Sequence, residues 1–320
     1  MENMKTVEQM IVRPHMTVNQ LVQQMDACGI LGAGRIGQAT RILTEMFSDK
    51  ECTVFLSLAG PLVAGGLRQI LAELVDQGFV NAIVTTGANI VHDIIEALGY
   101  RHFVGSFSAN DPQLRKDGIG RIGDVYVRLQ AFEALEKLVF QVLDELPEDR
   151  RRHLTLQDFL NQVTTKLSDS SSILAKCRAR NVPIFSPGFL DSMVGLNLWT
   201  YSQTKTLTID LLQDLKRLMQ LGLEAKKSAA IILGGGSPKH HVLMANILRE
   251  GVDLAIQVTM DRPEAGSLSG AYLEEAISWG KIRRGAKYVT VVGDAVVCFP
   301  LIVAAALERL PEDKKRLPRH

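Results

Sequence analysis

Short apolar runs recur along the chain, each closed by glycine or proline and followed by a segment in which apolar residues have helical spacing. Because the runs are apolar without alternation, they are typical of strands covered on both faces. The expected strands cover residues 53–58, 82–86, 182–185, 229–233, 254–258 and 288–292. The expected helices cover residues 62–77, 90–98, 131–146, 156–167, 211–226 and 240–249. Strand and helix in regular turn predict a doubly wound α/β fold, with a mainly parallel, Rossmann-like sheet and helices on both faces.

The sequence contains no clear domain boundary. No linker rich in proline or serine divides the 320 residues, and no repeat or low-complexity segment occurs. The polar stretch 148–153 is the best candidate for a boundary, but a helix end followed by an exposed loop is the simpler interpretation. We therefore predict a single domain over residues 1–320, with residues 1–16 and 311–320 as mobile tails.

Composition excludes several classes of protein. The formal net charge of +1 gives no reason to expect nucleic acid or an anionic membrane as a partner. The four cysteines stand far apart and form no CxxC pair, which argues against a zinc site or a disulfide framework and fits a reducing compartment. The N-terminus lacks the plan of a signal peptide, and the longest apolar run, 295–307, is shorter than the roughly 20 residues of a membrane-spanning helix. We expect a soluble, cytoplasmic protein without a metal site.

Residues 32–37, with the sequence GAGRIG, match the GxGxxG pattern of dinucleotide-binding folds. That pattern binds a pyrophosphate only where a strand precedes it and the glycines lead into a helix. Here residues 18–25 have helical spacing, so that only Ile30 and Leu31 remain for a strand. We therefore favour the interpretation that these glycines join two helices, and we do not expect NAD to bind there.

Three turns at the ends of predicted strands are better candidates for a nucleotide site. Residues 58–61, 86–89 and 234–241 each lead from a strand into a helix. Each exposes backbone N–H groups at the start of a helix, which favours an anion. In an open parallel sheet, ligands bind outside the carboxyl ends of the strands. The three turns together favour a nucleotide, although a tight connection that requires small residues explains any single one.

The candidate chemistry centres on Lys281, which follows Trp279 by two residues and the carboxylates Glu274 and Glu275 by about two helical turns. A lysine amine is a nucleophile only when neutral, and its ordinary pKa of about 10.4 makes that form rare in water. Burial against the indole would disfavour the ammonium, and the carboxylates would attract a cationic substrate. Imine chemistry on an amine substrate is one hypothesis. A solvated lysine after a helix-ending glycine is the other.

The segment Ala276-Ile-Ser-Trp-Gly-Lys281 resembles the active-site segment of the deoxyhypusine synthase family, in which the nucleophilic lysine ends the motif. Four other segments resemble the same family and occur in its order. They are TVFLSLAG at 53–60, VTTGAN at 84–89, NVPIFSP at 181–187 through Asp191, and ILGGGSPKHH at 232–241. Any one of these segments would be weak evidence, but together they are specific and span nearly the whole chain.

The resemblance implies an enzyme that oxidises spermidine with NAD, cleaves the resulting imine and holds the butyl fragment on a lysine. The fragment then passes to a lysine of the hypusine-bearing translation factor of the 5A type, and the new imine is reduced. Lys281 would be the nucleophile, and His240 would contact the substrate as an acid or base. The other positions matched to substrate binding are Glu275, Trp279, Ser278, Gly266 and Ser267. The positions matched to NAD are Gly60, Ala64, Thr86, Gly87, Ala88, His92, Asp191, Gly235, Asp261, Asp294 and Ala295.

The resemblance also implies a homo-oligomer, a tetramer of paired dimers with the site at the dimer interface. The residues themselves leave two of the implied roles open. Asp191 could bond a ribose hydroxyl, or it could cap a helix. His240 could be a core or capping histidine, because its acid or base role follows from the resemblance alone.

The sequence departs from the family at three positions that bear on the substrate. Eukaryotic members place acidic residues on the polyamine at positions matched here by His92, Leu196 and Leu268. Three other acidic residues could compensate for this loss: Asp261, Glu264 and Glu274. Residues 259–264 are more similar to archaeal and bacterial members than to eukaryotic ones.

Three functions therefore stay open. The first is transfer of the aminobutyl group to a protein lysine, and the second is the same chemistry with a free diamine as acceptor, as in a homospermidine synthase. The third is a nucleotide-binding regulator in which Lys281 is inert. The convergence of Lys281, Trp279 and Glu275 in one short segment argues against the third.

Overall fold

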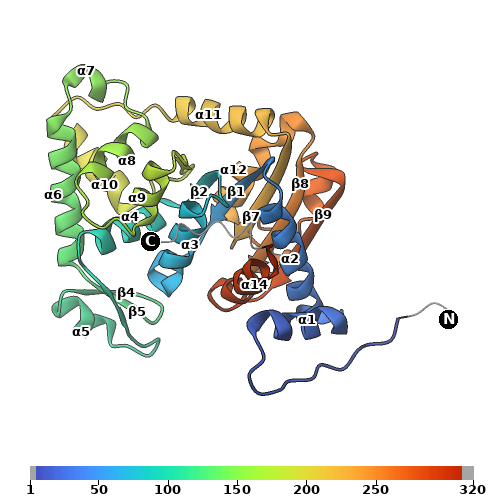
Figure 1. Cartoon of the computed structure of the whole chain (residues 1–320). Helices are drawn as coiled ribbons and strands as arrows, with labels where there is room; N and C mark the ends of the chain where they lie inside the picture. Colours follow the sequence, from blue (N-terminus) through green and yellow to red (C-terminus); the bar gives the residue numbers. More distant parts are fainter. Residues whose placement is uncertain (1–4, 312–320) are drawn as a thin grey trace. The chain divides into compact units, whose positions relative to one another are not determined.

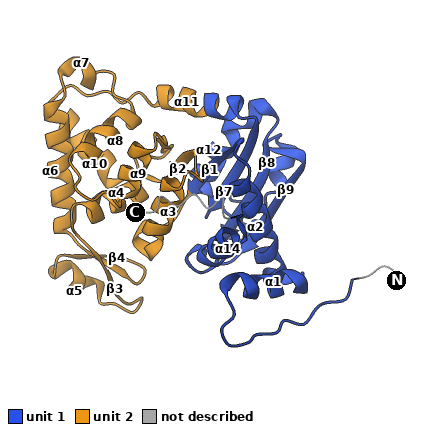
Figure 2. Cartoon of the chain, viewed as in Figure 1, with its two compact units in different colours: residues 1–57, 220–320 blue, residues 58–219 orange. Residues whose placement is uncertain are grey.

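The computed structural model describes residues 5–311, and the chain divides into two compact units. Unit 1 comprises residues 1–57 and 220–320, and unit 2 comprises residues 58–219 (Figure 2). A single domain over the whole chain stays a prediction. The predicted mobile tails lie partly outside the described residues, at 1–4 and 312–320.

Unit 1 is built on four strands in the order β1-β7-β8-β9 (Figure 1). The strands are β1 (Cys52–Leu58), β7 (Lys227–Leu233), β8 (Val252–Thr259) and β9 (Ile282–Val292). The helical elements are α1 (Val18–Cys28), α2 (Leu31–Ser48), α12 (Gly236–Ala245), η2 (Ile247–Arg249), η3 (Pro263–Ala265), α13 (Glu275–Ser278) and α14 (Ala295–Arg309). The border between the two units falls within α11 (Leu211–Glu224). β8 pairs in parallel with both β7 and β9. Strand β7 is buried at every position after its first, as the apolar run predicted.

Helices α1 and α2 meet at a turn that accounts for the glycine-rich pattern. Gly29 ends α1 in the left-handed conformation, at a φ of 74°, and α2 begins two residues later. Residues 32–37 therefore lie inside a helix, with no strand before them. A Cβ on Gly34 would lie 2.4 Å from the carbonyl carbon of Gly29, and one on Gly37 would lie 2.5 Å from Cα of Asp26. These glycines allow two helices to approach closely. The join itself is at Gly29, and not within the pattern as we expected.

Unit 2 contains two parallel strands, a small antiparallel sheet and a larger group of helices. The strands are β2 (Ala82–Thr85) and β6 (Ile184–Phe185), which pair in parallel, and β3 (His102–Val104), β4 (Ile119–Ile122) and β5 (Val125–Arg128), in the order β3-β5-β4. The helical elements are η1 (Val63–Leu67), α3 (Arg68–Asp76), α4 (Gly87–Ala97), α5 (Asp111–Lys116), α6 (Gln130–Glu145), α7 (Glu148–Arg151), α8 (Leu156–Thr165), α9 (Ile173–Ala179) and α10 (Met193–Ser202). The parallel strands and their helices confirm the predicted α/β class.

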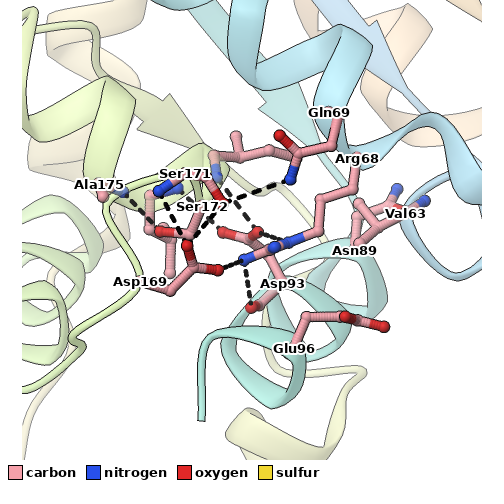
Figure 3. A network of polar contacts seen from close by, with 12 residues as sticks. Val63, Arg68, Gln69, Asn89, Asp93, Glu96, Asp169, Ser171, Ser172 and Ala175 are labelled. Carbon is pink, nitrogen blue, oxygen red and sulfur yellow. Dashed lines mark hydrogen bonds and ion pairs between the residues drawn. The ribbon is translucent and has the colours of Figure 1, made fainter. Parts of the chain in front are cut away.

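An ion-pair network joins α3, α4 and the start of α9 within unit 2 (Figure 3). The Arg68 guanidinium donates to Asp93 at 2.6 Å and to Asp169 at 2.8 Å. The Asp93 carboxylate also accepts from the backbone N–H groups of Ile173 and Leu174, at 3.1 and 2.9 Å. Loss of one partner from such a buried pair typically costs about 3–5 kcal/mol, because the other charge is left uncompensated. The network therefore fixes α4, which carries several of the predicted site residues.

The antiparallel sheet of unit 2 was not predicted. Its strands are short and half-exposed, and Val104 is almost fully exposed, so they lack the continuous apolar run that marked the parallel strands. The sequence does hold a signal for it, because Gly123 and Asp124 separate two runs rich in β-branched residues, as in a β-hairpin. The polar stretch 148–153 contains α7, a helix of one turn. No helix in the described part of the chain combines the length and the apolar character needed to cross a membrane.

Candidate active site

Lys281 is held by the turn that follows α13. Gly280 adopts the left-handed conformation at a φ of 64°, and the backbone N–H of Lys281 donates to the carbonyl of Ala276 at 2.9 Å. The carbonyl of Lys281 accepts from the N–H of Val252, at the first residue of β8. Glycine adopts this conformation without the strain that a side chain would add. The turn therefore fixes the lysine immediately before β9, at the amino end of that strand.

The side chain of Lys281 lines a cavity of about 300 Å³ within unit 1. Its Nζ atom lies 3.4 Å from Nδ1 of His240, which α12 carries. Glu275, at the start of α13, lines the same cavity although it is exposed. The rest of the wall is mostly apolar and consists of Leu243, Leu268, Ala271, Tyr272, Ala276 and Trp279, with Lys239. The cavity thus brings a lysine amine, an imidazole and a carboxylate together beside an apolar surface.

Trp279 differs from its expected environment. Its side chain is 69% exposed, so Lys281 is not buried against it. Nζ of Lys281 lies 5.4 Å from the centre of the indole ring, a cation–π contact. The prediction that Lys281 is buried against the indole was therefore wrong.

His240 lies beside the amine of Lys281. Burial lowers the pKa of its imidazole, and the positive charge of Lys281 lowers it further. The ring is therefore neutral near pH 7 and can accept a proton at Nδ1. It lies inside α12, whose N-cap is Gly235, so a capping role is excluded. His240 is thus placed within hydrogen-bond range of the lysine amine.

Lys239 is a second lysine of the cavity, and sequence analysis missed it. It is only 3% exposed, and burial lowers its pKa to about 8. Its ammonium donates to Oε1 of Gln257 at 3.1 Å and to the carbonyls of Leu268 and Ala271 at 3.0 and 2.5 Å. Three donors thus meet three acceptors, as a buried ammonium requires. The only signal in the sequence was its place in the motif SPKHH, next to His240.

Gln257, on β8, extends this network to the turn after β7. Its Nε2 donates to the carbonyl of Gly234 at 3.2 Å and to that of Ser269 at 3.1 Å. A Cβ on Gly235 would lie 2.3 Å from Cα of Ser269, so no side chain fits there. The segment around Ser269 therefore contacts both a turn predicted to bind NAD and the wall of the Lys281 cavity. Sequence analysis missed Gln257 because it lies in an apolar strand.

The predicted residues of unit 1 that do not line the cavity include Ser278, Gly266, Ser267 and Asp261. The hydroxyl of Ser278 donates to the backbone carbonyl of Glu275, and the Ser267 hydroxyl accepts from a backbone N–H. Gly266 ends η3 in the left-handed conformation. Asp261 lies exposed after β8. Their substrate and cofactor roles stay predictions.

The other cofactor candidates of unit 1 lie at the carboxyl ends of parallel strands. Gly235 follows β7, and Asp294 and Ala295 follow β9. Asp294 caps α14 by accepting from the N–H of Val296 at 2.8 Å. These two turns open helices of 10 and 15 residues, so that backbone N–H groups are available to an anion.

The cofactor candidates at the start of unit 2 surround the turns after β1 and β2. Gly60 has a φ of 86°, and nothing would contact a Cβ there within 4 Å. Ala64 is buried in η1. Thr86 is the N-cap of α4, and its hydroxyl accepts from Nδ2 of Asn89 at 3.3 Å. Oδ1 of Asn89 accepts from the N–H of Val63 at 3.2 Å, which ties the two turns together.

Ala88, His92 and Asp191 line a second and larger cavity, of about 1020 Å³, within unit 2. Gly87 belongs to the same region, because a Cβ there would lie 2.6 Å from Cβ of Ser192. Ser192 is the N-cap of α10 and accepts from a backbone N–H, so the capping alternative for Asp191 was wrong. The Asp191 carboxylate remains available to a ligand hydroxyl. Leu196, on the exposed side of α10, lines this cavity too.

Comparison with known proteins gives a consistent result. A family model described as deoxyhypusine synthase matches residues 20–306. The probable deoxyhypusine synthase of Methanothermobacter thermautotrophicus is 44% identical over 304 residues, which cover 95% of this chain and 98% of the relative. The probable deoxyhypusine synthase 1 of Methanosarcina acetivorans is 43% identical and covers 93% of each chain. A crystal structure from Entamoeba histolytica, assigned to deoxyhypusine synthase, aligns with a TM-score of 0.65 over 92% of this chain and 94% of that one; at 21% identity this likeness supports the fold alone.

Proposed function

The chain belongs to the deoxyhypusine synthase family, and we propose that it transfers the 4-aminobutyl group of spermidine, with NAD, to an amine acceptor through an imine on Lys281. The observation that carries this proposal is the placement of Lys281 beside His240 in a cavity with an apolar wall and the carboxylate of Glu275. An inert lysine would not require a neutral imidazole at hydrogen-bond range. The placement therefore argues against a non-catalytic regulator.

The residues of the cavity suit each part of such a transfer. His240 would take a proton from the Lys281 ammonium, and the neutral amine would attack the C=N carbon of the oxidised donor. The new C–N bond forms as the bond to the diaminopropane nitrogen breaks, and that nitrogen leaves with a proton. Glu275 would hold the distal ammonium of the butyl fragment, and Trp279 would lie along its methylene groups. The apolar wall would limit access of water, which otherwise hydrolyses the imine.

NAD would supply the hydride acceptor for donor oxidation and return the hydride to the new imine. The residues fit a dinucleotide in two respects. The helices that begin after Thr86, Gly235 and Asp294 each offer backbone N–H groups to phosphate, and Gly60 leaves open space where a side chain would stand. The carboxylate of Asp191 is free to accept from ribose hydroxyls. His92, Ala64, Gly87, Ala88, Asp261 and Ala295 complete the residues that the resemblance assigns to NAD.

The acceptor is proposed to be a lysine of a translation factor of the 5A type. A free diamine is the second candidate, and one observation favours it. Leu268 lines the Lys281 cavity where eukaryotic members are expected to place a carboxylate, and Leu196 does the same in the cavity of unit 2. The loss of these carboxylates is a departure from the eukaryotic members, whose acceptor is a protein lysine, and it therefore favours the other acceptor.

Trapping the covalent intermediate tests the proposed function. The protein would be incubated with NAD and spermidine labelled in the butyl group, reduced with borohydride and digested for peptide mapping. We expect the label on Lys281, and its release when either the translation factor or putrescine is added before borohydride. Label on a different lysine, or no NADH formed with spermidine, would end this proposal. Release by one acceptor alone would identify the natural one.

We also propose a homotetramer, on the resemblance alone, and a cytoplasmic location. Closed symmetric oligomers are common among soluble enzymes. Light scattering at micromolar concentration should give about four times the chain mass of 35.2 kDa. A particle of one chain mass would contradict the tetramer.

A further inference from the structure

A polar cavity of about 330 Å³ lies within unit 2, beside the amino end of β6. Residues 182–183, directly before that strand, form part of its wall. The rest includes Gln157 and Asn161 on α8, Arg178 on α9 and Arg217 on α11. None of the residues proposed for NAD or spermidine lines this cavity, so it lies outside the proposed active site.

A backbone N–H fixes the orientation of two amide side chains in this wall. The N–H of Ile184, on β6, donates to Oε1 of Gln157 at 2.8 Å. Nε2 of Gln157 donates in turn to Oδ1 of Asn161 at 3.1 Å. Because a backbone N–H can only donate, turning either amide round would break this sequence of bonds. Nδ2 of Asn161 is therefore left as a donor, and within residues 5–311 it has no hydrogen-bond partner.

Two guanidinium groups, those of Arg178 and Arg217, supply the charge of the cavity wall. Within residues 5–311, neither side chain forms an ion pair or a hydrogen bond. A positive charge in the last turn of α9 is favourable by itself and would account for Arg178. It does not account for a second guanidinium, from α11, at the same cavity.

No negative charge balances the two arginines in the wall, because no carboxylate of the described residues lines the cavity. Asp214, one turn before Arg217, is buried and accepts from the backbone N–H of Leu156 at 2.8 Å, at the amino end of α8. The Cys177 thiol lines the cavity, but burial raises its pKa well above the ordinary value, so it stays uncharged. The wall thus carries two positive charges and no negative one.

We propose that this cavity binds a phosphate group of a small anionic molecule, held by the guanidinium groups of Arg178 and Arg217 and by the side-chain N–H groups of Asn161. Guanidinium groups match the geometry of phosphate oxygens, and an amide N–H adds a donor without adding charge. The volume of about 330 Å³ is at the lower end for small-ligand sites, which suits a diphosphate or a small phosphate ester. The inference does not depend on the proposed function.

Pyrophosphate is the probe for this site. Calorimetry at constant ionic strength would measure its affinity for wild type, Arg178→Gln, Arg217→Gln and the double variant. Ion pairs at exposed side chains predict about fivefold weaker binding in each single variant and at least about tenfold weaker binding in the double variant. Arg115→Gln, at an exposed arginine on α5 outside the wall, is the control and should bind as wild type. The proposal is overturned by a smaller loss in the double variant, or by wild type that shows no saturable binding.

Asn161→Asp tests the amide donor separately. The carboxylate can still accept from Gln157, but it replaces the free N–H groups with an oxygen. We expect pyrophosphate affinity to fall by at least about tenfold, because a donor to a charged group is replaced by a like charge. Gln162→Glu adds the same charge to α8 outside the wall and should bind near the wild-type level. A smaller loss in Asn161→Asp, or an equal loss in Gln162→Glu, would contradict the site.

Thermal denaturation gives a second measurement on the same variants. A ligand that binds only the folded protein raises its melting temperature, so pyrophosphate should stabilise wild type and leave the double variant and Asn161→Asp unchanged. The melting temperatures without ligand show whether each variant is folded. Equal stabilisation of wild type and the double variant would count against the site.

NAD also carries phosphate groups, and its binding separates this cavity from the proposed active site. NAD affinity should be the same in wild type and in the double variant, because no residue proposed for NAD lines this cavity. Saturating NAD should not displace pyrophosphate. Displacement, or a parallel loss of NAD affinity, would place the probe in the nucleotide site and overturn this proposal. Failure to label Lys281 would end the proposed transfer and leave this site standing.

Discussion

Nζ of Lys281 lies 3.4 Å from Nδ1 of His240, although the two residues are 41 positions apart in the sequence. The lysine is set by a left-handed turn before β9 and the histidine by the second turn of α12. The two residues are held by different elements, and the packing of α12 brings their side chains together. The imidazole of His240 thus lies within hydrogen-bond range of the lysine amine, whereas the indole of Trp279 is exposed.

Replacement of Lys281 by arginine should abolish transfer. A guanidinium keeps the positive charge but stays protonated, so it cannot attack an imine. We expect NAD to bind as in wild type and the transfer rate to fall by at least about a thousandfold. Lys287→Arg, at an exposed lysine paired with Glu45, is the matched control and should keep wild-type rates. Transfer by Lys281→Arg at wild-type rate would rule out the nucleophile.

The pH dependence of transfer should report His240. Its pKa is lowered from the ordinary value of about 6.5, so the neutral form persists at more acidic pH than for a free histidine. The value of kcat/KM should therefore stay constant from pH 7.5 downward and fall only below about pH 6.5. His240→Gln should be slower and should lack this acid limb. An acid limb centred above pH 6.5, or one retained in His240→Gln, would contradict the assignment.

Lys239→Met should weaken donor binding more than turnover. The substitution leaves the carbonyls of Leu268 and Ala271 and the side chain of Gln257 without their donor. Each unsatisfied buried group costs about 1–3 kcal/mol, so we expect a lower melting temperature and a raised KM for spermidine. In wild type the ammonium is present below its pKa of about 8 and is lost above it, so KM should rise through pH 8.

The variant supplies its own pH test, because Lys239→Met should show no rise in KM through pH 8. Lys226→Met, at an exposed lysine that pairs with Glu51, is the control for removing a charge. A KM that is equal in wild type and Lys239→Met would show that this lysine does not position the cavity wall.

The glycine-rich pattern gives a matched pair of substitutions. A Cβ on Gly32 contacts nothing within 4 Å, whereas one on Gly34 would overlap the backbone of Gly29. Gly32→Ala should leave both stability and NAD affinity within about 1 kcal/mol of wild type. Gly34→Ala should destabilise the packing of α1 on α2 by about 1–3 kcal/mol, read from denaturant unfolding. A hundredfold loss of NAD affinity in Gly32→Ala would restore this pattern as a nucleotide site.

The sequence by itself determined the α/β class, the parallel strands and the family. Continuous apolar runs such as residues 229–233 predict strands buried on both faces, because burial of a strand depends on its own side chains. The motif that ends at Lys281 and the glycine turns are local in the same sense, since their residues are neighbours along the chain. The antiparallel sheet of unit 2 was missed because its strands are short, half-exposed and partly charged.

Only the tertiary structure decided which groups meet. The ammonium of Lys239 donates to backbone carbonyls about 30 residues further along the chain. Glu96 and His92, both on α4, are each within hydrogen-bond range of His102, which lies on β3. The sequence also did not show which side chains are exposed. It predicted that Trp279 forms a buried wall beside Lys281, but the side chain of Trp279 is exposed. The physical reason is the same in each case. Hydrogen bonds and burial depend on distances across the fold, and spacing along the chain does not fix those distances.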